Sequence, residues 1–163
     1  MIICALGYGY VAKKVLREIC SSGAKGIGVT TKKVNPPSND QIQIYPRNRT
    51  KEAIMLSTHL LISAPPNSQG CPILKTFYNT IIRSNVRSIT YLSTTGVYGN
   101  HNGGWVNEKS DLKAKSFFDK IRLDAENQWI NFCLENTISI NIIRISAFYG
   151  PNRIKVFTKK KAD

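Results

Sequence analysis

The stretch at residues 2–12, IICALGYGYVA, decides the fold of this 163-residue chain. Residues 2–6 are apolar and have the length of a short buried strand. The turn after them fits the pattern G-x-G-x-x-A. Gly7 permits a tight turn, Gly9 lets the backbone approach a pyrophosphate, and Ala12 lets a helix pack closely on a strand. The N-terminus of the next helix would offer N–H groups and partial positive charge to the phosphates. The stretch therefore predicts a dinucleotide-binding βαβ unit.

Apolar runs alternate with helical patterns along the rest of the chain. Val11, Val15 and Ile19 recur every four residues and predict the apolar side of the first helix. Further strands are expected at residues 26–31, 41–45, 59–64, 88–93 and 138–145, and helices at 51–57, 73–83 and 116–134. This alternation predicts a doubly wound parallel sheet of about six strands, a Rossmann-like α/β domain over residues 1–151. Residues 152–163 are expected to form a disordered basic tail.

Composition excludes several classes of protein. Hydrophobic residues make up 42% and charged residues 20%, as in a folded globular domain. No apolar run approaches the roughly 20 residues that a transmembrane helix needs, so no membrane partner is expected. The four cysteines are scattered without a C-x-x-C pair, which argues against a metal site and fits a reducing compartment. The N-terminus has no basic leader, so we expect a cytoplasmic protein.

The net charge of +13 raises the question of nucleic acid. Residues 153–163 hold five basic residues and one acidic residue, a net charge of +4, and the other +9 is spread over 152 residues. No arginine-rich stripe or ladder of aromatic and basic residues accompanies it. An anionic small molecule is therefore the favoured partner, and nucleic acid bound through the tail is the less favoured alternative.

The end of the second expected strand bears on the choice of dinucleotide. A site for NAD usually has an acidic residue there for the ribose 2′-hydroxyl. No Asp or Glu occurs between Glu18 and Asp40, and residues 30–33 read TTKK. Hydroxyls and cations suit a 2′-phosphate, so NADP is favoured over NAD; the less favoured alternative is that the lysines are solvated loop charges. Small residues, Ser63 and Ala64, end the fourth expected strand and leave room for a ligand.

Three later motifs carry a resemblance to a known family. Residues 91–99 read YLSTTGVYG, residues 105–108 read WVNE, and residues 143–151 read IRISAFYGP. Together with the glycine turn they resemble, in order and over nearly the whole chain, the extended and atypical short-chain dehydrogenase/reductases. These form the NAD(P)-dependent epimerase/dehydratase family, and the resemblance implies a dinucleotide cofactor and a small-molecule substrate that we cannot name.

The resemblance also implies roles for single residues. Thr94 falls where the family has its catalytic Ser/Thr. The family's catalytic Tyr and Lys fall on Phe118 and Arg122, counted from the continuation of that helix at residues 125–126. Phenylalanine has no proton to give, and losing a general acid/base typically costs about 10²–10⁴ in rate. Arg122 keeps the charge but presents a planar fork. Tyr98, four residues beyond Thr94, is a candidate substitute for the missing tyrosine. The catalytic candidates are therefore Thr94, Tyr98 and Arg122.

Other interpretations of these residues stay open. Phe118 could belong to the core, since it recurs at helical spacing with Ala125 and Trp129. Arg122 and Glu126 could form a surface ion pair worth about 0.3–0.5 kcal/mol. An exposed loop histidine is the favoured interpretation of His101. The cofactor-binding candidates are Gly7, Gly9, Tyr10, Val11, Ala12, Thr31, Lys32, Ser63, Ala64 and Arg122.

Members of the family usually continue well past the Tyr-Gly-Pro motif, with a C-terminal region that closes over the substrate. We therefore expect this chain to lack most of that region. It could be a truncated reading frame, have a partner that supplies the missing part, or be a binding module that never needed it. Truncation is favoured, and it predicts exposed apolar surface and self-association.

The function expected from the sequence is NAD(P) binding of the atypical epimerase/dehydratase type, with NADP favoured. Phe118 and Arg122 in the two slots argue against oxidoreductase or epimerase activity. The alternative is a non-enzymatic cofactor-sensing or partner-binding module, or an inactive remnant of a longer enzyme.

Overall fold

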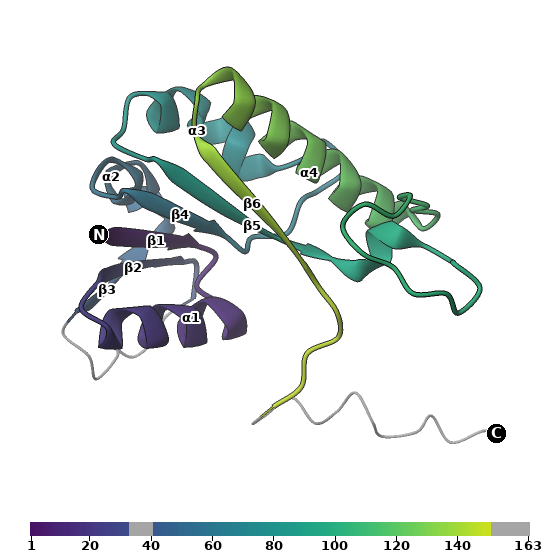
Figure 1. Cartoon of the computed structure of the whole chain (residues 1–163). Coiled ribbons are helices and arrows are strands. Elements are labelled where there is room, and N and C mark those ends of the chain that lie inside the picture. Colours follow the sequence, from purple (N-terminus) through teal and green to yellow (C-terminus); the bar gives the residue numbers. More distant parts are fainter. Residues whose placement is uncertain (33–40, 151–163) are drawn as a thin grey trace.

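The computed structural model describes residues 1–32 and 41–150 and contains one six-stranded sheet (Figure 1). The strands are β1 (Ile2–Leu6), β2 (Lys25–Thr30), β3 (Ile42–Pro46), β4 (His59–Ile62), β5 (Ser88–Thr94) and β6 (Ser139–Ile145). The α-helices are α1 (Tyr10–Ser21), α2 (Thr50–Met55), α3 (Pro72–Ile82) and α4 (Phe117–Glu135), with short 3₁₀ turns η1 (Arg47–Arg49) and η2 (Thr95–Tyr98). Lys33, Pro151 and the basic tail lie outside the described residues.

The sheet is parallel throughout and has the order β3-β2-β1-β4-β5-β6. The chain adds strands on one side of β1, then crosses to the other side at β4. In a sheet of this kind the crevice outside the carboxyl ends of the strands at that reversal is the ligand site. The predicted doubly wound Rossmann-like fold is confirmed, and its order places β1 and β4 beside the crevice.

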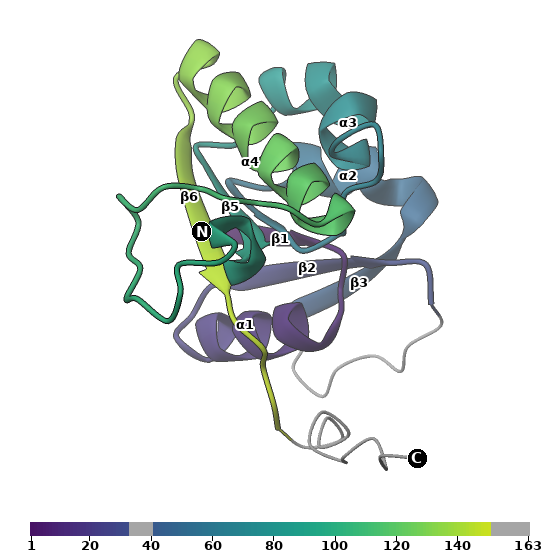
Figure 2. The ribbon, with the colours of Figure 1, turned by 90° about the vertical axis from the view of Figure 1, so that its right-hand side faces the viewer.

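The helices cover the two faces of the sheet unequally (Figure 2). One face carries α2, α3 and α4, and the core there includes Ile54, Leu74 and Trp129. The other face carries α1. Its core forms where Ala12 and Leu16 meet Ile3 and Ala5 of β1. Both faces of the strands are apolar because helices lie over them, as is usual for parallel sheets.

The predicted apolar side of α1 is displaced by one residue. The fully buried positions are Ala12, Leu16 and Cys20, not the predicted series that begins at Val11. The valines and Ile19 lie beside the buried stripe and are partly exposed. Both series have a spacing of four residues, so periodicity alone could not choose between them. The series that contains Ala12 is the buried one because the small side chain of Ala12 lets the helix approach the sheet closely.

The strand ends also differ from the prediction. Strand β4 ends at Ile62, and the next two residues leave the ladder. The backbone N–H groups of Ser63 and Ala64 both donate to the Leu6 carbonyl oxygen at 3.0 Å. The end of β4 is thereby fixed to the end of β1. Strand β2 ends at Thr30, which leaves Thr31 and Lys32 in the loop at the crevice.

The interpretation of Phe118 as a core residue is wrong. Its side chain is 76% exposed, while Ala125 and Trp129 further along the same helix are fully buried. The first turn of α4 lies over the η2 turn, where Asp119 is the near neighbour of Gly96, and so does not reach the apolar face of the sheet. The helical spacing was correct, but the buried stripe begins later in the helix.

The buried thiols make stability sensitive to alkaline pH. Burial raises the pKa of Cys4 from 9.0 to about 12 and that of Cys133 to about 11. Well below pH 9 both thiols are protonated in the folded and the unfolded chain. Above pH 9 the unfolded chain loses protons that the folded chain keeps, so we expect the free energy of unfolding to fall from pH 9 toward pH 11.

Urea unfolding at pH 7.5, 9 and 10.5 measures this effect. The double variant Cys4→Ala/Cys133→Ala is the control, because it should show a shallower fall over the same range. An equal fall in both proteins would contradict the assignment to these thiols.

Candidate functional site

The glycine turn joins β1 to α1 at the crevice. Gly7 has a φ of +103°, a left-handed conformation that favours glycine. A Cβ at this position would lie 2.8 Å from the backbone nitrogen of Ala64 and 2.9 Å from Oγ of Ser63. The Ser63 hydroxyl donates to the Gly7 carbonyl oxygen. The sequence needs glycine here for two reasons, the backbone conformation and the closeness of β4.

The N-terminus of α1 is open to an anion. The N-cap is Gly9, whose backbone N–H donates to the Gly7 carbonyl oxygen at 2.7 Å and which offers no side-chain cap. The first amides of a helix have no acceptor within the helix, and the helix dipole adds partial positive charge there. The first turn of α1 also contains no acidic residue. The turn has the features that suit a pyrophosphate.

Two cavities lie on either side of this turn. One, of about 570 Å³, lies toward β2 and β3, and we call it the β2–β3 cavity. The other, of about 580 Å³, lies toward β5 and β6, and we call it the β5–β6 cavity. Gly7, Gly9 and Ser63 line both. The turn is therefore the place where a single elongated ligand could extend from one cavity into the other.

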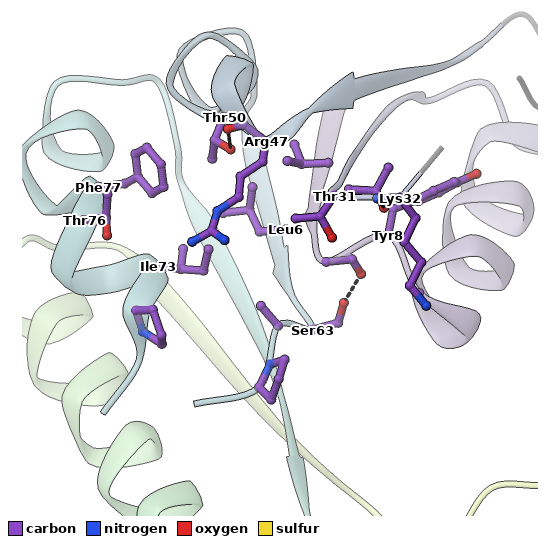
Figure 3. A pocket seen from close by; sticks show the side chains of 17 residues that line it. Leu6, Tyr8, Thr31, Lys32, Arg47, Thr50, Ser63, Ile73, Thr76 and Phe77 are labelled. Atoms are coloured by element: carbon purple, nitrogen blue, oxygen red, sulfur yellow. Dashed lines mark hydrogen bonds between the residues drawn. The ribbon is translucent and has the colours of Figure 1, made fainter. Parts of the chain in front are cut away.

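The β2–β3 cavity combines an apolar wall with two cations. Leu6 of β1 and Ile73 of α3 form part of its wall, and the guanidinium of Arg47 is directed into the space between them (Figure 3). Lys32 lies on the opposite side of the cavity, together with Thr31. Within residues 1–32 and 41–150, no Asp or Glu lines this cavity. Its apolar wall and its two cations suit an apolar group that carries an anion.

The β5–β6 cavity contains Arg122 and the hydroxyls at the end of β5. Arg122 donates from Nη1 to the Leu92 carbonyl oxygen at 3.2 Å and to the Tyr91 hydroxyl at 3.4 Å. Oγ of Ser93 is buried and has no hydrogen-bond partner among the described residues. Oγ1 of Thr94 accepts from the Gly96 backbone N–H at 3.2 Å. In the part of the chain that the structure describes, no carboxylate lines this cavity either.

The surface ion pair expected between Arg122 and Glu126 is not formed. Glu126 is 1% exposed and its carboxylate pairs with Arg144, with 2.9 Å between Oε2 and Nη2. Arg122 turns instead toward β5. The i,i+4 spacing allowed an ion pair between Arg122 and Glu126. Spacing along one helix could not show that Arg144, on strand β6, lies closer to the Glu126 carboxylate.

Two other sequence candidates lie away from both cavities. Tyr98 is buried, and its hydroxyl accepts from Nη1 of Arg144 at 3.1 Å. Phe118 lines neither cavity. Nε2 of His101 lies 3.1 Å from the Asp111 carbonyl oxygen, in the loop where an unexceptional histidine was expected. The structure thus separates Tyr98 from Thr94 and Arg122.

The ten cofactor-binding candidates all line one cavity or the other. The sequence analysis missed Arg47, Tyr8 and the α3 residues Ile73 and Phe77. Arg47 carried a signal, because it directly follows the β3 strand and so lies at the carboxyl edge of the sheet. The α3 residues carried none, since an apolar helical position is equally typical of the core.

Two absences hold for the described residues. Within residues 1–32 and 41–150, no group of three or more His, Cys, Asp or Glu side chains could hold a metal ion. Over the same ranges, no helix is long and apolar enough to cross a membrane.

The fold and the glycine turn define the class, a Rossmann-like domain with a dinucleotide-type crevice. No protein-family model matches the sequence, and no curated protein matches it. Solved structures do match. A conserved protein of unknown function from Silicibacter pomeroyi is 30% identical with a TM-score of 0.79, and the match covers 93% of this chain. The UDP-glucuronic acid 4-epimerase of Bacillus cereus in complex with NAD is 16% identical with a TM-score of 0.74, over 92% of this chain.

The UDP-N-acetylglucosamine 4-epimerase of Bacillus cereus is also similar, at 20% identity and a TM-score of 0.74 over 93% of this chain. The resemblance to the NAD-dependent epimerase/dehydratase family is confirmed at the level of the fold. The chain spans about half the length of these structures, 54% of the first, 57% of the second and 55% of the third.

Two glycine variants distinguish the cost of backbone strain from the cost of a clash between the glycine turn and β4. Gly7→Ala places a Cβ in a left-handed residue and against β4, whereas Gly23→Ala meets a similar strain, at φ +94°, with nothing within 4 Å. We expect Gly23→Ala to lose about 1–2 kcal/mol of stability, the cost of strain alone. We expect Gly7→Ala to lose more, and urea unfolding measures both.

Proposed function

We propose that this protein binds a dinucleotide of the NAD(P) class across the two cavities. The pyrophosphate would lie at the N-terminus of α1, the adenosine half in the β2–β3 cavity and the nicotinamide half in the β5–β6 cavity. The observation that carries the proposal is that the glycine turn lines both cavities. Two further features fit such a ligand. Gly7 leaves no room for a Cβ, so the turn keeps its backbone bare, and the buried Ser93 hydroxyl has no hydrogen-bond partner among the described residues.

We further propose that NADP is preferred over NAD. Lys32 and Thr31 follow β2 at the adenosine side, and Arg47 faces them across the cavity. A 2′-phosphate carries negative charge, and charge-assisted hydrogen bonds to it are stronger than neutral ones. Among the described residues no carboxylate lines this cavity, which supports the same preference because a carboxylate would repel a phosphate. The NAD complexes among the similar structures belong to those proteins.

The arrangement favours binding over hydride chemistry. A bound nicotinamide ring would supply a hydride donor or acceptor, which needs a proton-transfer group beside it. Phe118 is exposed away from the cavity, and Tyr91 is fully buried and lines neither cavity. Thr94 could hydrogen-bond a substrate oxygen, and Arg122 could orient the ribose. We therefore propose a cofactor-sensing or partner-binding role, and an oxidoreductase or epimerase only as the second candidate.

Exposed aromatic side chains support the expected self-association. Trp105 is fully exposed, and Phe117 and Phe118 at the start of α4 are exposed together with their rings in edge contact. Adjoining exposed aromatic rings such as Phe117 and Phe118 are typical of interaction surfaces. The buried free cysteines fit the cytoplasmic location that we propose.

Titration with NADPH and NADH, followed by nicotinamide fluorescence, tests the proposed function. We expect NADPH to bind more tightly than NADH. Lys32→Ala should weaken NADPH about tenfold and leave NADH unchanged, because it removes one charged contact worth about 1.5 kcal/mol. Lys25→Ala is the matched control, since Lys25 is an exposed lysine at the opposite end of the same strand.

Binding of neither dinucleotide at millimolar concentration would overturn the proposed function. Tighter binding of NADH than NADPH would overturn only the preference.

The Phe118→Tyr variant tests whether a tyrosine at the position of the family's catalytic tyrosine restores NADPH oxidation. Because this side chain is exposed and lines neither cavity, we expect no gain in NADPH oxidation with carbonyl substrates and a change in stability within about 0.5 kcal/mol. A stopped absorbance assay at 340 nm is the measurement. A clear gain in oxidation would show that only the acid was missing and would favour the enzymatic candidate.

A further inference from the structure

A buried polar network lies directly behind the β5–β6 cavity. Arg144 of β6 donates from Nη2 and Nε to the Glu126 carboxylate of α4, at 2.9 Å and 3.2 Å to the nearest oxygens. The same guanidinium donates from Nη1 to the Tyr98 hydroxyl at 3.1 Å and lies 4.9 Å from the centre of that ring. None of these three residues lines either cavity.

The network is enclosed by protein. Glu126 is 1% exposed, Tyr98 is 7% exposed and the Arg144 side chain is 16% exposed. A buried ion pair is weak evidence for stability, because removing two charges from water offsets much of their attraction. Its geometry is nevertheless specific, since a guanidinium that meets a carboxylate with two nitrogens fixes the planes of both groups. The network is therefore better suited to fixing position than to adding stability.

Two members of the network belong to elements that line the cavity, and the third belongs to the turn that directly follows β5. Glu126 follows Arg122 by one turn of α4. Arg144 precedes Ile145, which lines the cavity, and pairs in register with Ser93 of β5. Tyr98 ends the η2 turn that begins just after Thr94. The three contacts thus join α4, β6 and η2 at one point, immediately behind the side chains that face the cavity.

We infer that Arg144 is a positioning residue for the β5–β6 cavity. Through Glu126 it sets α4, and hence Arg122, against the end of β5. Through Tyr98 it holds the η2 turn beside Thr94. Tyr98 then acts through its hydrogen bond to Arg144 and has no proton-transfer role. The inference rests on the proposed function, since it assigns the nicotinamide half of the dinucleotide to this cavity.

Two ligands distinguish positioning from a general structural role. NADPH would occupy both cavities, whereas adenosine 2′,5′-bisphosphate would occupy only the β2–β3 cavity. The variants are Glu126→Gln, which removes the charge, and Tyr98→Phe, which removes only the hydroxyl and keeps the buried ring. Glu135→Gln is the matched control, an exposed glutamate at the end of the same helix. Urea unfolding of each variant establishes that it folds.

We expect Glu126→Gln to weaken NADPH about tenfold and Tyr98→Phe about threefold, with adenosine 2′,5′-bisphosphate changed less than twofold in both. Glu135→Gln should match the wild type with both ligands. If both ligands weaken by the same factor, or if NADPH affinity does not change, Arg144 has only a structural role and the inference fails. If the wild type binds neither ligand, the proposed function itself fails.

Discussion

The close approach of the Gly7 backbone to the end of β4 is the constraint on which the rest of the site depends. The Leu6 carbonyl oxygen accepts two backbone N–H groups from that end, and the Ser63 hydroxyl donates to Gly7. These contacts fix the two central strands where the strand order reverses, which opens the crevice. Because α1 begins immediately after the turn, the same contacts also set the direction of its N-terminus.

The two cavities depend on different parts of the chain. The β2–β3 cavity takes its cations from residues just after strands β2 and β3, so Lys32 and Arg47 line one cavity although they are distant in sequence. The β5–β6 cavity takes its polar groups from the end of β5 and from α4. Glu126 pairs with Arg144, and Arg122 donates to the end of β5 and lines that cavity. The network of Arg144, Glu126 and Tyr98 is linked to the cation in the cavity because Glu126 and Arg122 belong to the same helix, α4.

Much of this could be predicted from sequence, and the failures have a common physical cause. Apolar runs and the glycine turn predict the fold because strand length, turn chemistry and helix start all depend on neighbouring residues. Glu126 was misassigned because its partner lies on another element, 18 residues away. Phe118 was misassigned because helical spacing shows which residues share a face and not where the sheet beneath that face ends. Arg47 was missed because its role depends on which strand ends meet at the crevice.

The cations that line the cavities have a consequence for kinetics. The chain carries a net charge of +13, and among the described residues the cavities are lined by cations and by no acidic side chain. A positively charged crevice raises the local concentration of anions and steers their diffusion toward it, and salt weakens this effect within a Debye length of about 8 Å at physiological ionic strength. An anionic ligand would therefore encounter the crevice faster in dilute buffer than in salt, while its contacts inside would depend less on the ions outside.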